Sequence, residues 1–181
     1  MAASVIVLNG GSSSGKSTLA HSLQNDLREP WLSFSIDTFV SALPPSLEST
    51  EDGIRFDPGG TVTPGPTFRE LETAWMEGIA AMARAGARII VDDVFLGGRE
   101  GQERWRAALR DLEVLWVGVR CDPEVAEARE AARGDRIAGM ARAQALIVHQ
   151  GVDYDVVVDT TAMDPAACCR AIADKVAKAS R

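Results

Sequence analysis

Residues 10–17 read Gly-Gly-Ser-Ser-Ser-Gly-Lys-Ser and match the pattern G-x-x-x-x-G-K-[ST], which strongly constrains how the chain can fold. A β-branched apolar run at residues 5–8 precedes this octet, and residues 16–27 carry leucines at helical spacing. A strand, a glycine-rich loop and a helix in this order form a phosphate-binding loop, in which backbone N–H groups and the helix N-terminus face an anion. A flexible glycine–serine linker, the alternative interpretation, lacks this context.

The octet therefore predicts a site for a nucleoside triphosphate and Mg²⁺. Glycines allow the backbone to curl around the phosphates, Lys16 reaches the terminal phosphates, and the Ser17 hydroxyl can bind Mg²⁺. The residues that we expect to contact the nucleotide in this loop are Gly10, Gly11, Ser12, Ser13, Ser14, Gly15, Lys16, Ser17 and Thr18.

Composition and charge exclude several classes of protein. The chain has 181 residues, of which 46% are apolar, so we expect a single domain over residues 1–181 with one sizeable core. A formal net charge of −7 argues against binding to nucleic acid or to an anionic membrane surface. No apolar run is long enough for a transmembrane helix, and no targeting segment is recognisable, so we expect a cytoplasmic protein.

Five strand-like apolar runs alternate with helical or helix-starting segments. This alternation predicts an α/β fold, with a five-stranded parallel sheet and helices on both faces. We expect a P-loop NTPase of the nucleotide-kinase or shikimate-kinase type, with strand order 2-3-1-4-5. The runs lie at residues 4–8, 31–36, 88–91, 114–119 and 154–158.

Helix starts are marked at three places. Thr67 and Glu70 have the spacing of a capping box ahead of an apolar helical stripe. Asp122 and Asp164 each precede a proline, as expected for an N-cap residue followed by proline at the first helical position.

The segment from residue 44 to 66 is rich in proline, glycine, serine and threonine, and we predict a loop that carries a short hairpin. Such a long connection inside a compact domain is usually functional. Because it leaves the carboxyl end of the second strand, we expect it to form a wall of the site that binds a phosphate acceptor.

Two aspartates follow strands of the predicted sheet, at the edge where parallel sheets bind ligands. Asp37 follows the second strand, and we expect it to orient the acceptor and to act as the base. Asp92 follows the third strand, and we expect it to lie near Mg²⁺, directly or through water. The alternatives are an N-cap role for Asp37, ahead of residues 38–43, and a solvated strand end for Asp92.

A basic cluster, Arg133-Gly134-Asp135-Arg136, lies between two helical stretches where small-molecule kinases carry a lid, which we place at about residues 133–148. Guanidinium groups can stabilise charge on a phosphoryl group in transfer. The alternative interpretation is a solvated basic corner with Asp135 as a local partner.

The chain resembles the chloramphenicol phosphotransferases, which are ATP-dependent, antibiotic-inactivating kinases. The resemblance extends over nearly the whole length. The first of its segments is generic, and the others are far more specific. The segments are residues 5–17, 29–37, 86–98, 114–122 and 133–140.

The resemblance implies transfer of the γ-phosphate of ATP to the primary (3-) hydroxyl of chloramphenicol, and a role in antibiotic resistance. It implies that Asp37 is the base and that Lys16, Arg133 and Arg136 contact the phosphates. The residues themselves agree with a neutral acceptor, because residues 35–67 contain one arginine, Arg55, and several acids.

Two other functions are compatible with the sequence. A kinase of another small hydroxylated metabolite would use the same catalytic residues and differ in its pocket. A nucleotide-dependent switch would bind nucleotide to control a partner surface, although the chain lacks the guanine-reading N-K-x-D pattern. The sequence predicts neither the oligomeric state nor the nucleotide-base preference.

Overall fold

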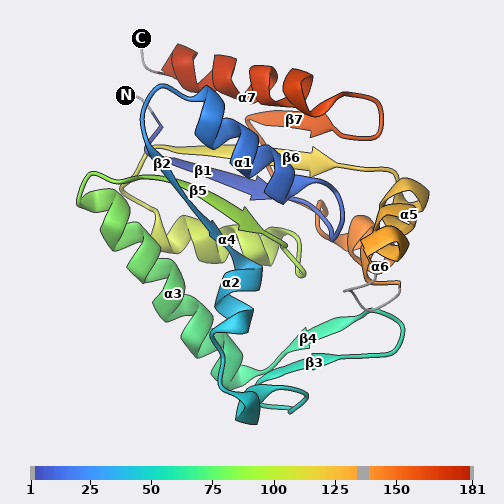
Figure 1. Cartoon of the computed structure of the whole chain (residues 1–181). Coiled ribbons are helices and arrows are strands. Elements are labelled where there is room, and N and C mark those ends of the chain that lie inside the picture. Colours follow the sequence, from blue (N-terminus) through green and yellow to red (C-terminus); the bar gives the residue numbers. More distant parts are fainter. Residues whose placement is uncertain (1–2, 134–138, 180–181) are drawn as a thin grey trace.

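A five-stranded parallel sheet forms the centre of the computed structural model, which describes residues 3–133 and 139–179 (Figure 1). The strand order is β2-β5-β1-β6-β7, and β3 and β4 form a separate hairpin, so the predicted order 2-3-1-4-5 is confirmed for the sheet. The strands of the sheet are β1 (Val5–Asn9), β2 (Trp31–Ser35), β5 (Arg88–Asp93), β6 (Val114–Arg120) and β7 (Val156–Asp159).

Helices cover both faces of the sheet because its central strand is apolar on both sides. Ile6 and Leu8 of β1 pack in a core with α1 (Lys16–Asp26) and α7 (Pro165–Ala179). Val5 and Val7 point to the opposite face, where α3 (Pro66–Arg84) and α4 (Arg99–Ala108) pack. Side chains alternate between faces along a strand, so one apolar run supplies both cores. Figure 1 shows the two helix layers on either side of the sheet.

The segment predicted as a loop with a hairpin, residues 44–66, lies beyond the carboxyl end of β2 and contains a 3₁₀ turn (Pro45–Leu47) and the antiparallel strands β3 (Ile54–Phe56) and β4 (Val62–Pro64). Together with the preceding helix α2 (Ile36–Ser41), it forms a small unit. Phe39 and Phe68 pack edge to face in its core, with ring centroids 5.3 Å apart. The hairpin is thereby held against α3, and its tip extends toward the lid region (Figure 1).

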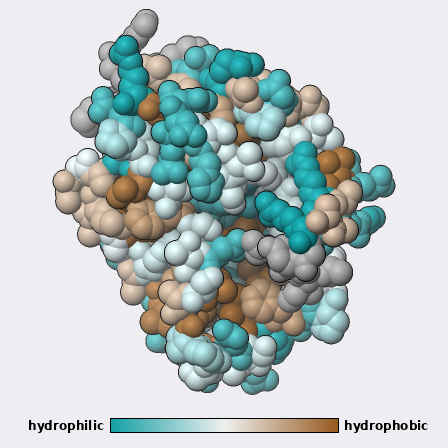
Figure 2. Space-filling model, viewed as in Figure 1, coloured by the Kyte–Doolittle hydropathy of each residue, from teal (hydrophilic) through white to brown (hydrophobic). Residues whose placement is uncertain are grey.

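The segment predicted as a lid, about residues 133–148, starts at the last residue of α5 (Pro123–Arg133) and includes, after residues 134–138, α6 (Met140–Ile147). Figure 2 shows hydrophilic surface near these helices and apolar surface in the lower part of the same view, over the hairpin unit. In the part of the chain that the structure describes, no helix has both the length and the apolar character that crossing a bilayer requires.

Two of the three predicted helix caps are confirmed. Asp122 and Asp164 each accept a hydrogen bond from an amide in the first turn of α5 and α7, respectively. The capping box at Thr67 is wrong, because α3 begins one residue earlier, at Pro66, and Gly65 is its N-cap residue. Proline is well suited to the first helical position, since it lacks the N–H group that would stay unpaired there.

Candidate active site

The glycine-rich loop joins β1 to α1 in the conformation expected of a phosphate cradle. Gly15 has φ of 92°, a left-handed conformation that favours glycine. A Cβ atom at Gly10 would lie 2.5 Å from the carbonyl oxygen of Val119, so this position admits no side chain. The hydroxyls of Ser13 and Ser14 are buried and have no hydrogen-bond partner among the described residues. Buried polar groups are rarely left unpaired, which suits a loop that surrounds an anion.

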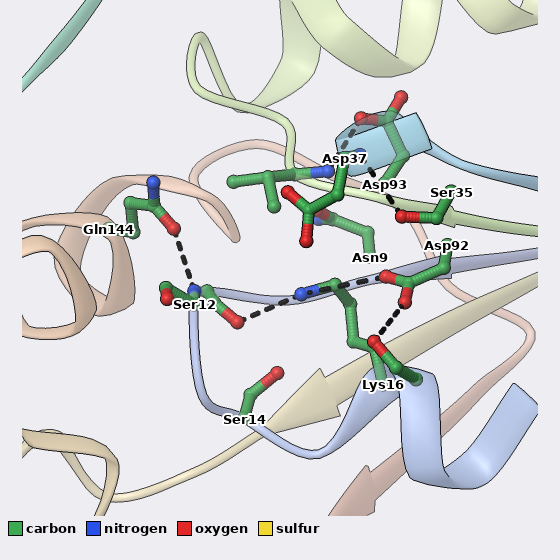
Figure 3. Close-up of polar contacts among 12 residues, drawn as sticks. Asn9, Ser12, Ser14, Lys16, Ser35, Asp37, Asp92, Asp93 and Gln144 are labelled. Atoms are coloured by element: carbon green, nitrogen blue, oxygen red, sulfur yellow. Dashed lines mark hydrogen bonds and ion pairs between the residues drawn. The ribbon is translucent and has the colours of Figure 1, made fainter. Parts of the chain in front are cut away.

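Lys16, Ser17 and Asp92 form a compact polar cluster beside this loop (Figure 3). The Ser17 hydroxyl donates to Oδ2 of Asp92 at 2.6 Å, and Nζ of Lys16 lies 3.7 Å from Oδ1 of the same carboxylate. Lys16 also donates to the carbonyl oxygen of Gly11 at 2.9 Å. The cluster follows from the sheet register, because β1 and β5 are parallel neighbours and Asp92 is paired with Leu8.

Asp37 lies in the first turn of α2, directly after β2. The alternative that Asp37 caps a helix is wrong, since the cap residue is Ser35, whose hydroxyl accepts the backbone N–H of Asp37 at 3.0 Å. Ser35 is paired with Asp92 across β2 and β5, which brings the two aspartates to the same edge of the sheet. In Figure 3 the Asp37 carboxylate points into the space between Lys16 and Gln144.

Two cavities meet at Asp37. The first, here called the phosphate cavity, is lined by the glycine-rich loop, Lys16, Ser17, Asp92 and Arg133. The second, here called the apolar cavity, lies against the hairpin. Its apolar lining includes Ile54, Phe56, Val62, Pro64, Phe68 and Leu96. Five residues line both cavities, namely Ile36, Asp37, Val94, Met140 and Gln144.

The apolar cavity also contains an ion pair from α3. Glu72 is 4% exposed, and its carboxylate lies 2.7 Å from Nη1 of Arg69 and 3.3 Å from Nε of Arg104. Arg69 and Glu72 both line the cavity. Arg69 is thus already in contact with a buried carboxylate, which it shares with Arg104.

The structure describes one of the two arginines that we predicted to lie in the lid. Arg133, the last residue of α5, lines the phosphate cavity. Arg136, which we predicted to be catalytic, lies outside the described residues. A third cavity on the other side of Gly15 and Thr18 is lined by Arg129 and Thr160, and Arg129 donates to the carbonyl oxygen of Thr160 at 2.9 Å.

Asp92 and Asp93 are adjacent in sequence and face different surroundings. Asp93 accepts hydrogen bonds from the Trp105 indole and from the Val94 amide, away from Ser17. Burial raises the pKa of Asp93 to about 6, and the nearby carboxylates of Glu72 and Asp92 act in the same direction against the hydrogen bonds. Asp92 is therefore the acid of this pair that belongs to the phosphate cavity.

Sequence reasoning missed two polar residues beside the loop. Gln144 of α6 is buried, and its Oε1 accepts the backbone N–H of Ser12 at 2.7 Å. Asn9 at the end of β1 donates to the carbonyl oxygen of Val148 at 2.7 Å and to the hydroxyl of Tyr154 at 2.6 Å. A polar residue at a buried strand end could have indicated Asn9, whereas no sequence signal marks Gln144.

A comparison of the sequence with known protein families agrees with the phosphate-binding geometry of the site. The model of the chloramphenicol phosphotransferase-like protein family matches residues 3–177. The chain belongs to this family. A relative from Mycobacterium tuberculosis (strain CDC 1551 / Oshkosh), whose name describes an O-phosphotransferase, is 34% identical over 175 residues, which cover 87% of this chain and 75% of the relative.

Solved structures of small-molecule kinases share the fold. A sugar kinase from Janibacter sp. HTCC2649 is similar with a TM-score of 0.68 and 19% identity, over 92% of this chain and 90% of that one. Shikimate kinase from Acinetobacter baumannii is similar with a TM-score of 0.65 and 15% identity, over 96% and 93% of the two chains. Together with the family, these findings establish this member of the chloramphenicol phosphotransferase-like family as a small-molecule kinase with a P-loop fold.

Proposed function

We propose that this kinase transfers the γ-phosphate of ATP to a hydroxyl of a small neutral acceptor, and that the acceptor is chloramphenicol, phosphorylated at its primary (3-) hydroxyl. The observation that carries the proposal is the position of Asp37, which lines both the phosphate cavity and the apolar cavity. A carboxylate at the junction can hold the hydroxyl of a molecule in one cavity toward a phosphate in the other.

The residues of the phosphate cavity fit a triphosphate and Mg²⁺. The unpaired hydroxyls of Ser13 and Ser14 supply donors, and the ammonium group of Lys16 supplies positive charge. Ser17 and Asp92 offer the oxygen ligands that Mg²⁺ prefers. When bound there, Mg²⁺ would neutralise charge on the phosphates. Arg133 adds a second cation to the lining of the cavity.

Asp37 would act on the acceptor hydroxyl. The hydroxyl oxygen forms a bond to the γ-phosphorus, the bond from that phosphorus to the oxygen bridging it to the β-phosphate breaks, ADP leaves, and the hydroxyl proton passes to the Asp37 carboxylate. In a loose transition state little charge builds up on the attacking oxygen, so an ordinary carboxylate suffices to align the hydroxyl and accept its proton late.

The lining of the apolar cavity supports a neutral acceptor with a substantial apolar part. Its walls are mainly aliphatic and aromatic, and Arg69, the one cation among its described lining residues, already contacts the carboxylate of Glu72. An anionic acceptor would lose its hydration against mostly apolar walls, whereas a neutral one would not. Chloramphenicol, an uncharged aromatic amide with hydroxyl groups, meets both requirements.

The deciding experiment incubates the purified protein with ATP, Mg²⁺ and chloramphenicol and searches for the mono-phosphorylated drug by mass spectrometry. We expect the drug to gain one phosphoryl group at the primary hydroxyl and ADP to form in equal amount. Phosphorylation of another alcohol in a panel, with no transfer to chloramphenicol, would instead support a kinase of a different hydroxylated metabolite. Expression in a chloramphenicol-sensitive bacterium tests the proposed role in resistance.

A further inference from the structure

Gln144 occupies the point where the glycine-rich loop, α6 and both cavities meet. Its side chain is buried and lines the phosphate cavity and the apolar cavity together with Asp37. Of the five residues that the cavities share, these two are the polar ones. The proposed chemistry of Asp37 accounts for the hydroxyl proton and assigns no part in the transfer to the Gln144 amide.

A hydrogen bond to the loop fixes the orientation of this amide. Oε1 of Gln144 accepts the backbone N–H of Ser12 at 2.7 Å, and only the oxygen of an amide can accept. The nitrogen end is therefore directed away from Ser12, and none of the hydrogen bonds among the described residues involves Nε2. In Figure 3 the Gln144 oxygen points toward Ser12, and the nitrogen lies at the opposite end of the amide.

Several contacts hold α6 firmly against the loop. A Cβ atom at Gly11 would lie 3.3 Å from the backbone nitrogen of Ala145, which shows how closely the helix approaches. Asn9 donates to the carbonyl oxygen of Val148 at the C-terminal end of the helix. The buried carboxylate of Glu130 accepts backbone N–H groups at the N-terminal end. A donor on such a fixed element is pre-organised, as catalysis by electrostatic stabilisation requires.

We propose that Gln144 is a catalytic residue whose Nε2 donates a hydrogen bond to an oxygen of the phosphoryl group while that group passes between the cavities. This inference rests on the proposed phosphoryl transfer and adds a charge-stabilising donor to it. The transferred group carries negative charge on its oxygens, and Gln144 offers a neutral donor opposite the Asp37 carboxylate that receives the proton.

Two variants of Gln144 separate a donor role from a structural one. Gln144→Glu keeps an oxygen that can accept the Ser12 N–H, and it replaces Nε2 by an oxygen that cannot donate when ionised. Gln144→Met keeps the approximate size and loses both functions without adding charge. The affinities of each full-length variant for Mg²⁺–ADP, and for Mg²⁺–ADP with aluminium fluoride as a mimic of the transferred phosphoryl group, are measured by calorimetry. Thermal unfolding checks that each variant is folded.

If Gln144 is a donor, Gln144→Glu should bind Mg²⁺–ADP with an affinity within a few-fold of that of the wild type. Its affinity for Mg²⁺–ADP with aluminium fluoride should be about 10²-fold lower, which is the typical cost of removing one transition-state donor. Gln144→Met should also bind that complex more weakly, because it lacks the donor as well. In Gln144→Glu, lowering the pH should restore part of the affinity, since a protonated carboxyl group can donate.

Other outcomes would overturn the inference. Wild-type affinity of Gln144→Glu for the aluminium fluoride complex, with only Gln144→Met impaired, would mean that the side chain serves only to hold Ser12. Wild-type affinity of Gln144→Met would mean that the added charge alone had weakened Gln144→Glu. These measurements use no acceptor, so failure to phosphorylate chloramphenicol would reject the proposed acceptor and leave the test of Gln144 intact.

Discussion

The Ser17 hydroxyl donates a hydrogen bond of 2.6 Å to Oδ2 of Asp92, which joins the first turn of α1 to the carboxyl end of β5. The other carboxylate oxygen lies 3.7 Å from the Lys16 ammonium group. A hydroxyl and a carboxylate oxygen in contact, beside the ammonium group of Lys16, form a suitable pair of ligands for Mg²⁺ in a P-loop kinase.

Asp92→Asn should weaken the Mg²⁺-dependent part of ATP binding. The amide has the size of the carboxylate and lacks its charge, so we expect the apparent Mg²⁺ affinity of the ATP complex to fall about 10- to 100-fold. Calorimetric titrations of ATP with Mg²⁺ and with EDTA measure this effect, and binding in EDTA serves as the control. Equal Mg²⁺ dependence in the variant and the wild type would remove Asp92 from the metal site.

Asp37→Ala should abolish transfer and leave ATP affinity nearly unchanged, because Asp37 lies on α2 and not in the glycine-rich loop. Loss of a general base lowers kcat by about 10²- to 10⁴-fold. Lys16→Ala, in contrast, should damage both transfer and ATP binding, since Lys16 is part of the loop. Steady-state kinetics and ATP titrations distinguish the two variants. Wild-type turnover by Asp37→Ala would defeat the assignment of the base.

The strands, the glycine-rich loop and the hairpin could be predicted because each depends mainly on the residues of its own segment. The apolar runs became the strands because their β-branched side chains fill both cores, and the octet at residues 10–17 formed the loop because its glycines permit the required backbone. Asp37 and Asp92 could be placed at one sheet edge from strand order alone. The hairpin was recognisable from the turn residues of the 44–66 segment.

Contacts between distant segments could not be predicted in the same way. Ser12 and Gln144 are 132 residues apart, and their hydrogen bond depends on how α6 docks against the loop. The capping box failed for a different, local reason: Thr67 and Glu70 have suitable spacing, but the helix already begins at Pro66, a residue type well suited to the first helical position.

Asp93 should make the free energy of unfolding decrease as the pH rises from about 4 to 6. Burial raises its pKa from 3.8 to about 6 in the folded protein, so the folded state holds a proton that the unfolded state releases between these values. Its favourable contribution is present below pH 3.8 and is lost as the pH rises through about 6, with a size on the order of 3 kcal/mol. His149, whose pKa burial lowers to about 4, changes stability in the opposite direction over this range.

The comparison with Asp93→Asn isolates this contribution, because the asparagine does not titrate. The unfolding free energy of the wild type minus that of the variant should decrease as the pH rises from about 4 to 7. Urea unfolding at several pH values measures this difference, and the effects of His149 and of other groups largely cancel in it. A difference that stays constant with pH would mean that Asp93 titrates normally.

Gly60→Ala should weaken acceptor binding without affecting the nucleotide. Gly60, at the tip of the hairpin, has φ of 79°, and a Cβ atom there would lie 2.3 Å from the backbone nitrogen of Met140, at the start of α6. Because Met140 lines both cavities, we expect the hairpin to move away from α6 and open the apolar cavity. The strain of an alanine at such a φ costs about 1–3 kcal/mol. If opening of the cavity relieves this strain and acceptor binding restores it, the acceptor KM would rise by up to roughly 5- to 150-fold.

The neighbouring glycine provides a matched control for this prediction. Nothing lies within 4 Å of a Cβ atom at Gly59, and Gly59 has no positive φ, so Gly59→Ala should keep the wild-type acceptor KM. The ATP dissociation constant should be unchanged in both variants, because neither glycine touches the glycine-rich loop. A wild-type acceptor KM for Gly60→Ala would show that the contact between the hairpin and α6 does not shape the acceptor site. An equal rise in both variants would instead attribute the effect to reduced flexibility of the turn at residues 57–61.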